Sequence, residues 1–83
     1  MINRYNRSFA CKCPTNGQPI IYHIAIATSG KMIYVEHINT AIALLESAYH
    51  EQIADILHAK LGGQQTLTAT HDGVLITTQR GEL

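Results

Sequence analysis

The first candidates for chemistry in this sequence are two cysteines that lie just before a tight turn. Cys11 and Cys13 close an alternating segment, and Pro14–Pro19, with Asn16-Gly17 at its centre, forms the turn. A cysteine thiolate is a nucleophile when a cation, a helix N-terminus or a base lowers its pKa. Cys13 lies at the end of the expected strand, next to the turn that begins at Pro14. We therefore expect it to be the more reactive of the two thiols. Both cysteines could instead be small buried residues of a strand.

A second segment, Tyr49-His50-Glu51, places a histidine and an acid at the expected start of a helix. A carboxylate can accept two parallel N–H bonds from an amino-pyrimidinone edge, so Glu51 suits a purine-like or pterin ligand. His50 could bond the same ring, or it could activate Cys13, because Lys12 points to the opposite face of its strand. An acid in the first turn of a helix is also favoured by the helix dipole without any ligand.

The spacing of the cysteines and histidines matches no known zinc pattern, so we expect no metal. Two cysteines two residues apart on a strand are about 6.5–7 Å apart, at the limit of disulfide geometry. We therefore expect free thiols.

The composition indicates one small globular domain covering residues 1–83, with 46% hydrophobic residues and no tryptophan. A chain of this length buries only about 60–65% of its unfolded surface, which makes assembly into a homo-oligomer a natural source of stability. Six basic and six acidic residues balance, which argues against direct nucleic-acid binding. No apolar run reaches the ~18–20 residues of a membrane span, and the start lacks a signal-peptide pattern. We expect a cytoplasmic protein with no membrane partner.

The first half of the chain has the alternation typical of strands. Residues Arg4–Cys13 alternate as a half-buried strand, and Ile20–Thr28 form a more apolar strand that we expect to be central. A break follows at Ser29-Gly30, after which Met32–Glu36 continue in extended conformation.

The period then changes to that of helices. Thr40 is a suitable N-cap for a first helix, and a second apolar stripe ends at Gly62-Gly63. Asp72-Gly73 between β-branched runs predicts a final hairpin. The order strand, strand, helix, helix, strand, strand predicts an α+β fold in which a four-stranded antiparallel sheet carries two helices on one face.

This order and several short motifs resemble the tunnelling-fold (T-fold) superfamily, and within it the 7-cyano-7-deazaguanine nitrile reductases (QueF) and QueF-like proteins. The motif matches are Cys13-Pro14, Gly17-Gln18-Pro19, Tyr49-His50-Glu51, Lys31-Met32 and Val35-Glu36. The resemblance implies that Cys13 is a catalytic nucleophile attacking a nitrile carbon, and that His50, Glu51 and Glu36 bind the substrate. It also implies a purine-like base or modified nucleoside as ligand, and a pocket built from adjacent subunits. The C-terminal half is similar, more weakly, to GTP cyclohydrolase I.

Two departures from the reductase pattern bear on the reaction. The acidic proton donor that follows Gly-Gln-Pro in the reductases is replaced by Ile20, and the lysine-bearing NADPH motif is absent after Glu36. We therefore expect no cofactor, and amine addition to a Cys13 thioimide in place of reduction. The alternative is a tunnelling-fold module that binds a purine or pterin, or another protein, without catalysis.

Overall fold

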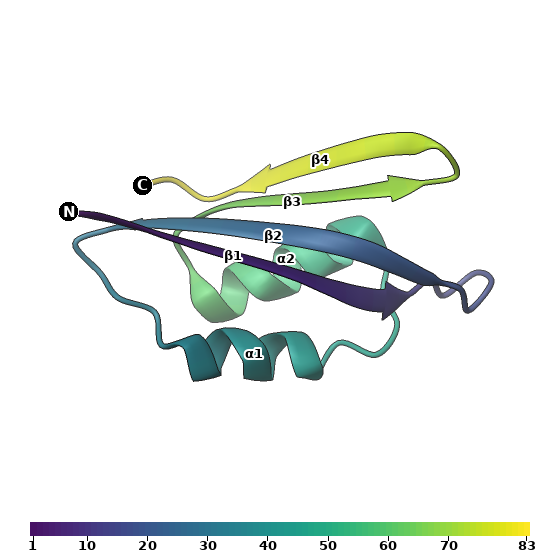
Figure 1. Cartoon of the computed structure of the whole chain (residues 1–83), viewed down its shortest axis with the longest axis horizontal. Coiled ribbons are helices and arrows are strands. Elements are labelled where there is room, and N and C mark those ends of the chain that lie inside the picture. The colour runs from purple at the N-terminus through teal and green to yellow at the C-terminus, as the bar shows by residue number, and fades with distance from the viewer.

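The computed structural model describes all 83 residues, and it has the predicted order of elements (Figure 1). The strands are β1 (Ile2–Lys12), β2 (Pro19–Ser29), β3 (Gln64–His71) and β4 (Val74–Arg80), and the helices are α1 (Val35–Ala43) and α2 (His50–Leu61). The strands form one antiparallel sheet in the order β1-β2-β3-β4, so β2 is central as predicted, and β1 and β4 are the edges.

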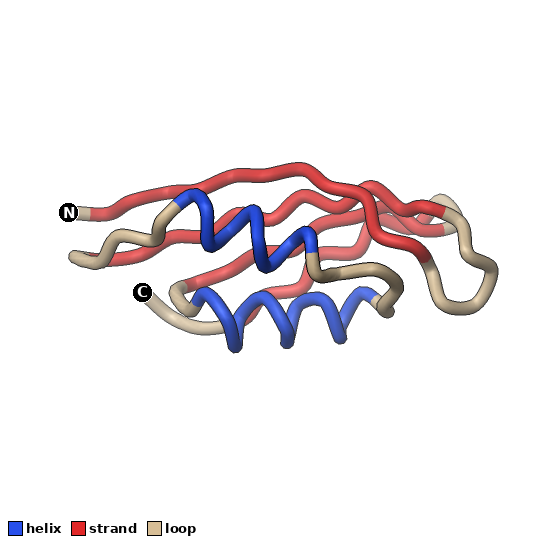
Figure 2. Tube along the Cα trace, turned by 90° about the horizontal axis from the view of Figure 1, so that it is seen from below, coloured by secondary structure: helices blue, strands red, loops and turns tan.

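Both helices lie on one face of the sheet (Figure 2). The period-2 pattern of β2 points Ile24 and Ile26 toward the helices, and each is only 1% exposed. From the helix side, Ile53 and Leu57 of α2 are completely buried. All four side chains belong to one core cluster, and burial of such side chains contributes roughly 1.5–3 kcal/mol each.

The other face of the sheet is uncovered and polar. On it Ser8 Oγ lies 3.1 Å from His23 Nδ1, and Asn6 Oδ1 lies 3.0 Å from His23 Nε2. His23 is exposed and hydrogen-bonded on both ring nitrogens, an arrangement that suits a sheet surface facing water.

The first helix begins earlier than the sequence predicts. Residues 31–34 form a loop, α1 starts at Val35 with Tyr34 as its N-cap, and Thr40 lies inside the helix. The prediction of extended structure for Met32–Glu36 was therefore wrong. A hydrogen bond across the fold, from Ile33 N–H to Tyr5 Oη (3.0 Å), fixes the loop and with it the entry to the helix.

The two hairpins of the sheet separate at one end. The last paired residues of β2 and β3 there are Tyr22 and Ala69. Beyond them Ile20 and Ile21 pair only with β1, while Thr70 and His71 pair only with β4. The sheet is thus split at the end that carries the β1–β2 turn and the β3–β4 turn, both at the right of Figure 1.

The β3–β4 turn has the predicted Asp-Gly geometry, with positive φ at Asp72 (50°) and Gly73 (80°). Positive φ at both central residues is the type I′ pattern, whose twist matches that of the flanking strands. Neither helix has the length and apolar character of a membrane span.

Candidate functional site

Cys13 lies just beyond the end of β1, in the first position of the turn. Its N–H donates to the Gln18 carbonyl (2.9 Å), and its carbonyl accepts from Gly17 N–H (2.8 Å), so the turn closes on Cys13 itself. Its side chain is buried at 4% exposure, beside Cys11 at 3%, and both thiols are free. The last residue of β1 is also bonded to the segment between the helices, because Ala48 N–H donates to the Lys12 carbonyl (3.2 Å).

The same end of the molecule holds the start of α2. Tyr49 is the N-cap, and its N–H donates to the Gln52 side chain (2.9 Å), which satisfies one of the free N–H groups at the helix start. The Tyr49 hydroxyl shares a hydrogen bond with Thr15 Oγ1 (3.1 Å) in the β1–β2 turn. The two motif segments, far apart in sequence, are therefore tied together directly.

Cys13 and His50 line one small cavity of about 30 Å³. Ile20 and Tyr22 of β2 and His71 at the end of β3 also border it. The volume is close to that of one water molecule, so the cavity fits the reacting tip of a ligand and no more. His71 was not predicted as a site residue, because in sequence it reads as part of the hairpin turn.

His50 is electrostatically suited to act as a base. Desolvation by burial lowers the pKa of His50, Arg80 adds to the lowering, and a backbone hydrogen bond with Leu67 and the charge of Glu51 oppose it. Its Nε2 is buried and has no hydrogen-bond partner, so Nδ1 is the nitrogen left for Leu67. A neutral imidazole held in this way keeps a free lone pair on Nε2.

The other buried groups of this region are held neutral. Burial raises the pKa of the Cys11 thiol against the opposing effect of backbone hydrogen bonds with Ala48 and Lys12. Burial, followed by the charges of Cys11 and Cys13, raises the pKa of Tyr22. Cys11 is therefore a core residue, which leaves Cys13 as the thiol at the cavity. The structure has no group of three or more His, Cys, Asp or Glu side chains placed to hold a metal ion.

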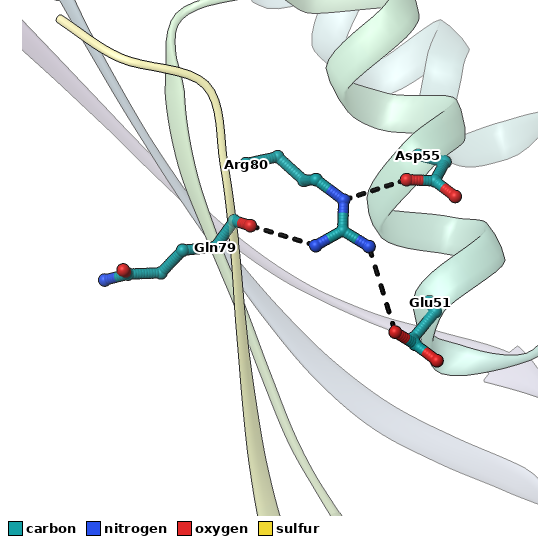
Figure 3. Close-up of polar contacts among 4 residues, drawn as sticks. All are labelled: Glu51, Asp55, Gln79 and Arg80. Carbon is teal, nitrogen blue, oxygen red and sulfur yellow. Dashed lines mark hydrogen bonds and ion pairs between the residues drawn. The ribbon is translucent and has the colours of Figure 1, made fainter.

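Glu51 is not among the residues that line the cavity. Its side chain projects from α2 beside Arg80 (Figure 3). One of its carboxylate oxygens is 4.0 Å from Arg80 Nη2, and the side chain is 84% exposed. Arg80 makes its shorter contact, 2.8 Å, with Asp55 one turn further along, and also donates to the Gln79 carbonyl (2.9 Å). Exposed ion pairs of this kind contribute about 0–1 kcal/mol, so Glu51 is free to accept other donors.

Glu36 lies far from the other predicted site residues. It is in the first turn of α1, beside a cleft of about 720 Å³ that Arg4, Lys31 and Tyr34 also line. This end of α1 is at the left of Figure 1, and the turns near Cys13 and His71 are at the right of a molecule whose longest extent is 41 Å. Within one chain, the fold brings Cys13 and His50 together but leaves Glu36 at the opposite end.

The order ββααββ, the antiparallel sheet and the helices on one face define this chain as a protein with the tunnelling fold. Among solved structures it is similar to the archaeosine synthase QueF-Like in the apo form. The match has a TM-score of 0.77 and 14% sequence identity, and it covers 95% of this chain and 90% of that chain. No family model and no curated protein matches the sequence. At this identity the likeness shows a shared fold.

The lowered pKa of His50 predicts a pH-dependent stability. Because the folded state disfavours the protonated ring, the unfolded chain binds more protons below its pKa of about 6.5. The contribution of His50 to the free energy of unfolding should therefore be largest above pH 6.5. It should decrease as the pH falls from there toward the pKa of His50 in the folded state. The slope for one such group is at most about 1.4 kcal/mol per pH unit.

Urea unfolding at pH 7.5 and pH 5.5 measures this effect. His50→Gln should lose less stability than wild type on acidification, whereas His37→Gln, at an exposed position of α1, should behave as wild type. Equal acid sensitivity in wild type and His50→Gln would show that His50 is not the responsible group.

Proposed function

We propose that this chain is a small QueF-like enzyme that converts the nitrile of a 7-deazaguanine-type base or nucleoside through a thioimide on Cys13. The observation that carries the proposal is that Cys13 and His50 line one cavity, and that the buried Nε2 of His50 has no hydrogen-bond partner. A nucleophile and a base at one cavity is the arrangement that covalent catalysis needs. The fold shared with an archaeosine synthase supports the choice of substrate class.

The proposed reaction starts with transfer of the Cys13 thiol proton to His50. The sulfur attacks the nitrile carbon, the C–S bond forms, and one π bond of the nitrile breaks as its nitrogen takes up a proton. Ammonia or another amine then adds to the thioimide carbon, the C–S bond breaks, and Cys13 recovers its proton. The product is an amidine. No electrons are gained or lost, so no hydride donor is needed, in agreement with the missing NADPH motif.

The heterocycle itself lies outside the small cavity in this proposal, because about 30 Å³ holds no bicyclic ring. Glu51 projects into solvent from the turn of α2 that begins with His50, so its carboxylate can accept the paired N–H groups of an amino-pyrimidinone edge. Glu36 can join the same pocket only from a second copy of the chain, because it lies at the other end of its own.

A homo-oligomer follows from this division of residues. The open edges of β1 and β4 offer unpaired backbone groups that a neighbouring copy can pair with, and closure of the sheet between copies removes both edges. The pocket would then combine Cys13, His50 and Glu51 of one subunit with Glu36 of the next.

A second function, ligand or protein binding without catalysis, has its own support. Ile20 lines the cavity with an apolar side chain where the reductases have an acid, and Cys13 is nearly inaccessible in the single chain. Such a module would bind a purine or pterin without forming a covalent bond.

The enzyme proposal predicts a covalent adduct. Incubation with 7-cyano-7-deazaguanine, without NADPH or amine, should increase the intact mass by that of one whole nitrile molecule. Cys13→Ala should abolish the adduct, and Cys11→Ala, the matched control two residues earlier in the chain, should retain it. A ligand that binds wild type without any adduct would favour the binding module, and an adduct that survives in Cys13→Ala would rule out the assigned nucleophile.

The assigned role of Glu51 predicts a loss of affinity in Glu51→Gln. Loss of a charge-assisted hydrogen-bonded contact typically costs about 1.5–3 kcal/mol, or roughly 10- to 150-fold in Kd, measurable by calorimetry in a Cys13→Ala background. Asp55→Asn is the control, because it removes the stronger partner of Arg80 on the same helix face without touching the proposed ligand contact. Equal losses in both variants would point to Arg80 instead.

The intersubunit pocket predicts an assembly in solution. Light scattering at micromolar concentration should give a mass that is a multiple of 9.2 kDa. A stable monomer would leave Glu36 without a site and would contradict the shared pocket.

A further inference from the structure

His71 has no role in the reaction so far, yet it borders the cavity that Cys13 and His50 line. It is the last residue of β3, its side chain is 40% exposed, and its Nε2 lies 3.8 Å from Asp72 Oδ2. The separation of β2 from β3 leaves this residue without a cross-strand partner on β2. His71 can therefore face both the cavity and solvent.

Thioimide formation needs an acid as well as a base. When a thiolate adds to a nitrile, negative charge develops on the nitrogen, and a donor within hydrogen-bond reach stabilises the transition state by protonating it. Ile20 lines the cavity, but its hydrocarbon side chain has no ionisable proton to donate. The chain must therefore supply the proton from another position around the same space.

The remaining cavity groups are poorly suited to this task. His50 is the proposed acceptor of the thiol proton, and its lowered pKa favours the neutral form. Tyr22 is 2% exposed, and burial raises its pKa, so it holds its proton strongly. The Tyr49 hydroxyl shares its hydrogen bond with Thr15. A histidine is the side chain that most readily carries an exchangeable proton near neutral pH, and His71 is the one left.

We propose that His71 is the catalytic acid that protonates the substrate nitrogen as Cys13 attacks, which rests on the proposed function of this site. The N–H bond of the protonated imidazole breaks, and a new N–H bond forms on the thioimide nitrogen. His71 leaves the step neutral and recovers a proton from water, and His50 releases the thiol proton to water. In net, one S–H has then added across the C≡N bond, and no redox partner is required.

The position of His71 fits the recovery of its proton. On the uncovered face of the sheet a cleft of about 570 Å³ is also lined by Ile20, Tyr22 and His71, so His71 borders this larger cleft as well as the small cavity. The carboxylate of Asp72, 3.8 Å from His71 Nε2, is 90% exposed, so this pair lies in contact with water.

The rate of thioimide formation on the intact chain, followed by mass spectrometry, tests the proposal. Two nitriles serve as probes: 7-cyano-7-deazaguanine, and 2-cyanopyrimidine, an activated nitrile that needs no recognition of a deazapurine. His71→Asn should slow adduct formation by about 100-fold or more with both, the usual contribution of a general acid, and leave the Kd of the base within about twofold. His71→Gln is a second variant in case the first folds poorly.

Two further variants complete the experiment. His37→Asn, in α1, should react as wild type, which controls for the loss of a histidine. Ile20→Asp in the His71→Asn background should recover at least a tenth of the wild-type rate, because position 20 borders the same cavity. A His71→Asn rate equal to that of wild type overturns the proposal.

The two probes separate this proposal from the one on which it rests. If wild type reacts with 2-cyanopyrimidine but not with the deazaguanine nitrile, the substrate class is wrong and the role of His71 is still decided by the His71→Asn rate. If wild type reacts with neither, nitrile chemistry at Cys13 fails, and the acid role of His71 fails with it.

Discussion

Burial of one face of the sheet against α2 is the contact on which the rest of the structure depends. Ile53 and Leu57 of α2 are completely buried in the same core cluster as Ile24 and Ile26 of β2, and α2 packs against β3 and β4. In a chain of 83 residues few side chains can be removed from water so fully, and this contact supplies a large share of what stabilises the fold. It also fixes the axis of α2. Because His50 is the first residue of that helix, the same packing that stabilises the domain sets the position of the proposed base.

The site is built where regular structure ends. The β1–β2 turn, the start of α2 and the β3–β4 turn meet at one end of the sheet, and the separation of β2 from β3 leaves space between them. A rigid scaffold that holds turns and helix ends together is the common way for small folds to position reactive groups. This arrangement lowers the stability of the fold at His50, whose buried Nε2 has no hydrogen-bond partner. An unsatisfied buried polar atom is destabilising by about 1–3 kcal/mol, and such atoms are expected where function outweighs stability.

The likeness to the archaeosine synthase QueF-Like concerns the backbone, and the side chains around the cavity differ from the pattern that the nitrile reductases show in sequence. Ile20 makes one wall apolar, and His71 contributes a titratable group from the opposite hairpin. A proton donor at position 20 of β2 or at position 71 of β3 would border the same cavity. Neither position would require a different fold, because both lie near strand ends. A shared scaffold can therefore carry a different arrangement of acid and base, and function has to be argued from the side chains.

The sequence by itself determined the order of elements, the central place of β2 and the Asp72-Gly73 turn, and it supplied Cys13, His50 and Glu51 as candidate site residues. These follow from periodicity, turn chemistry and local motifs, which act over a few residues. It misplaced the start of α1, because the bond from Ile33 to Tyr5 that fixes the preceding loop joins residues far apart in sequence. It also gave no sign of His71, which only the pairing register of β2 and β3 brings to the cavity. Tertiary structure decided these points, and the distance of Glu36 from Cys13, because packing between distant segments sets which side chains meet.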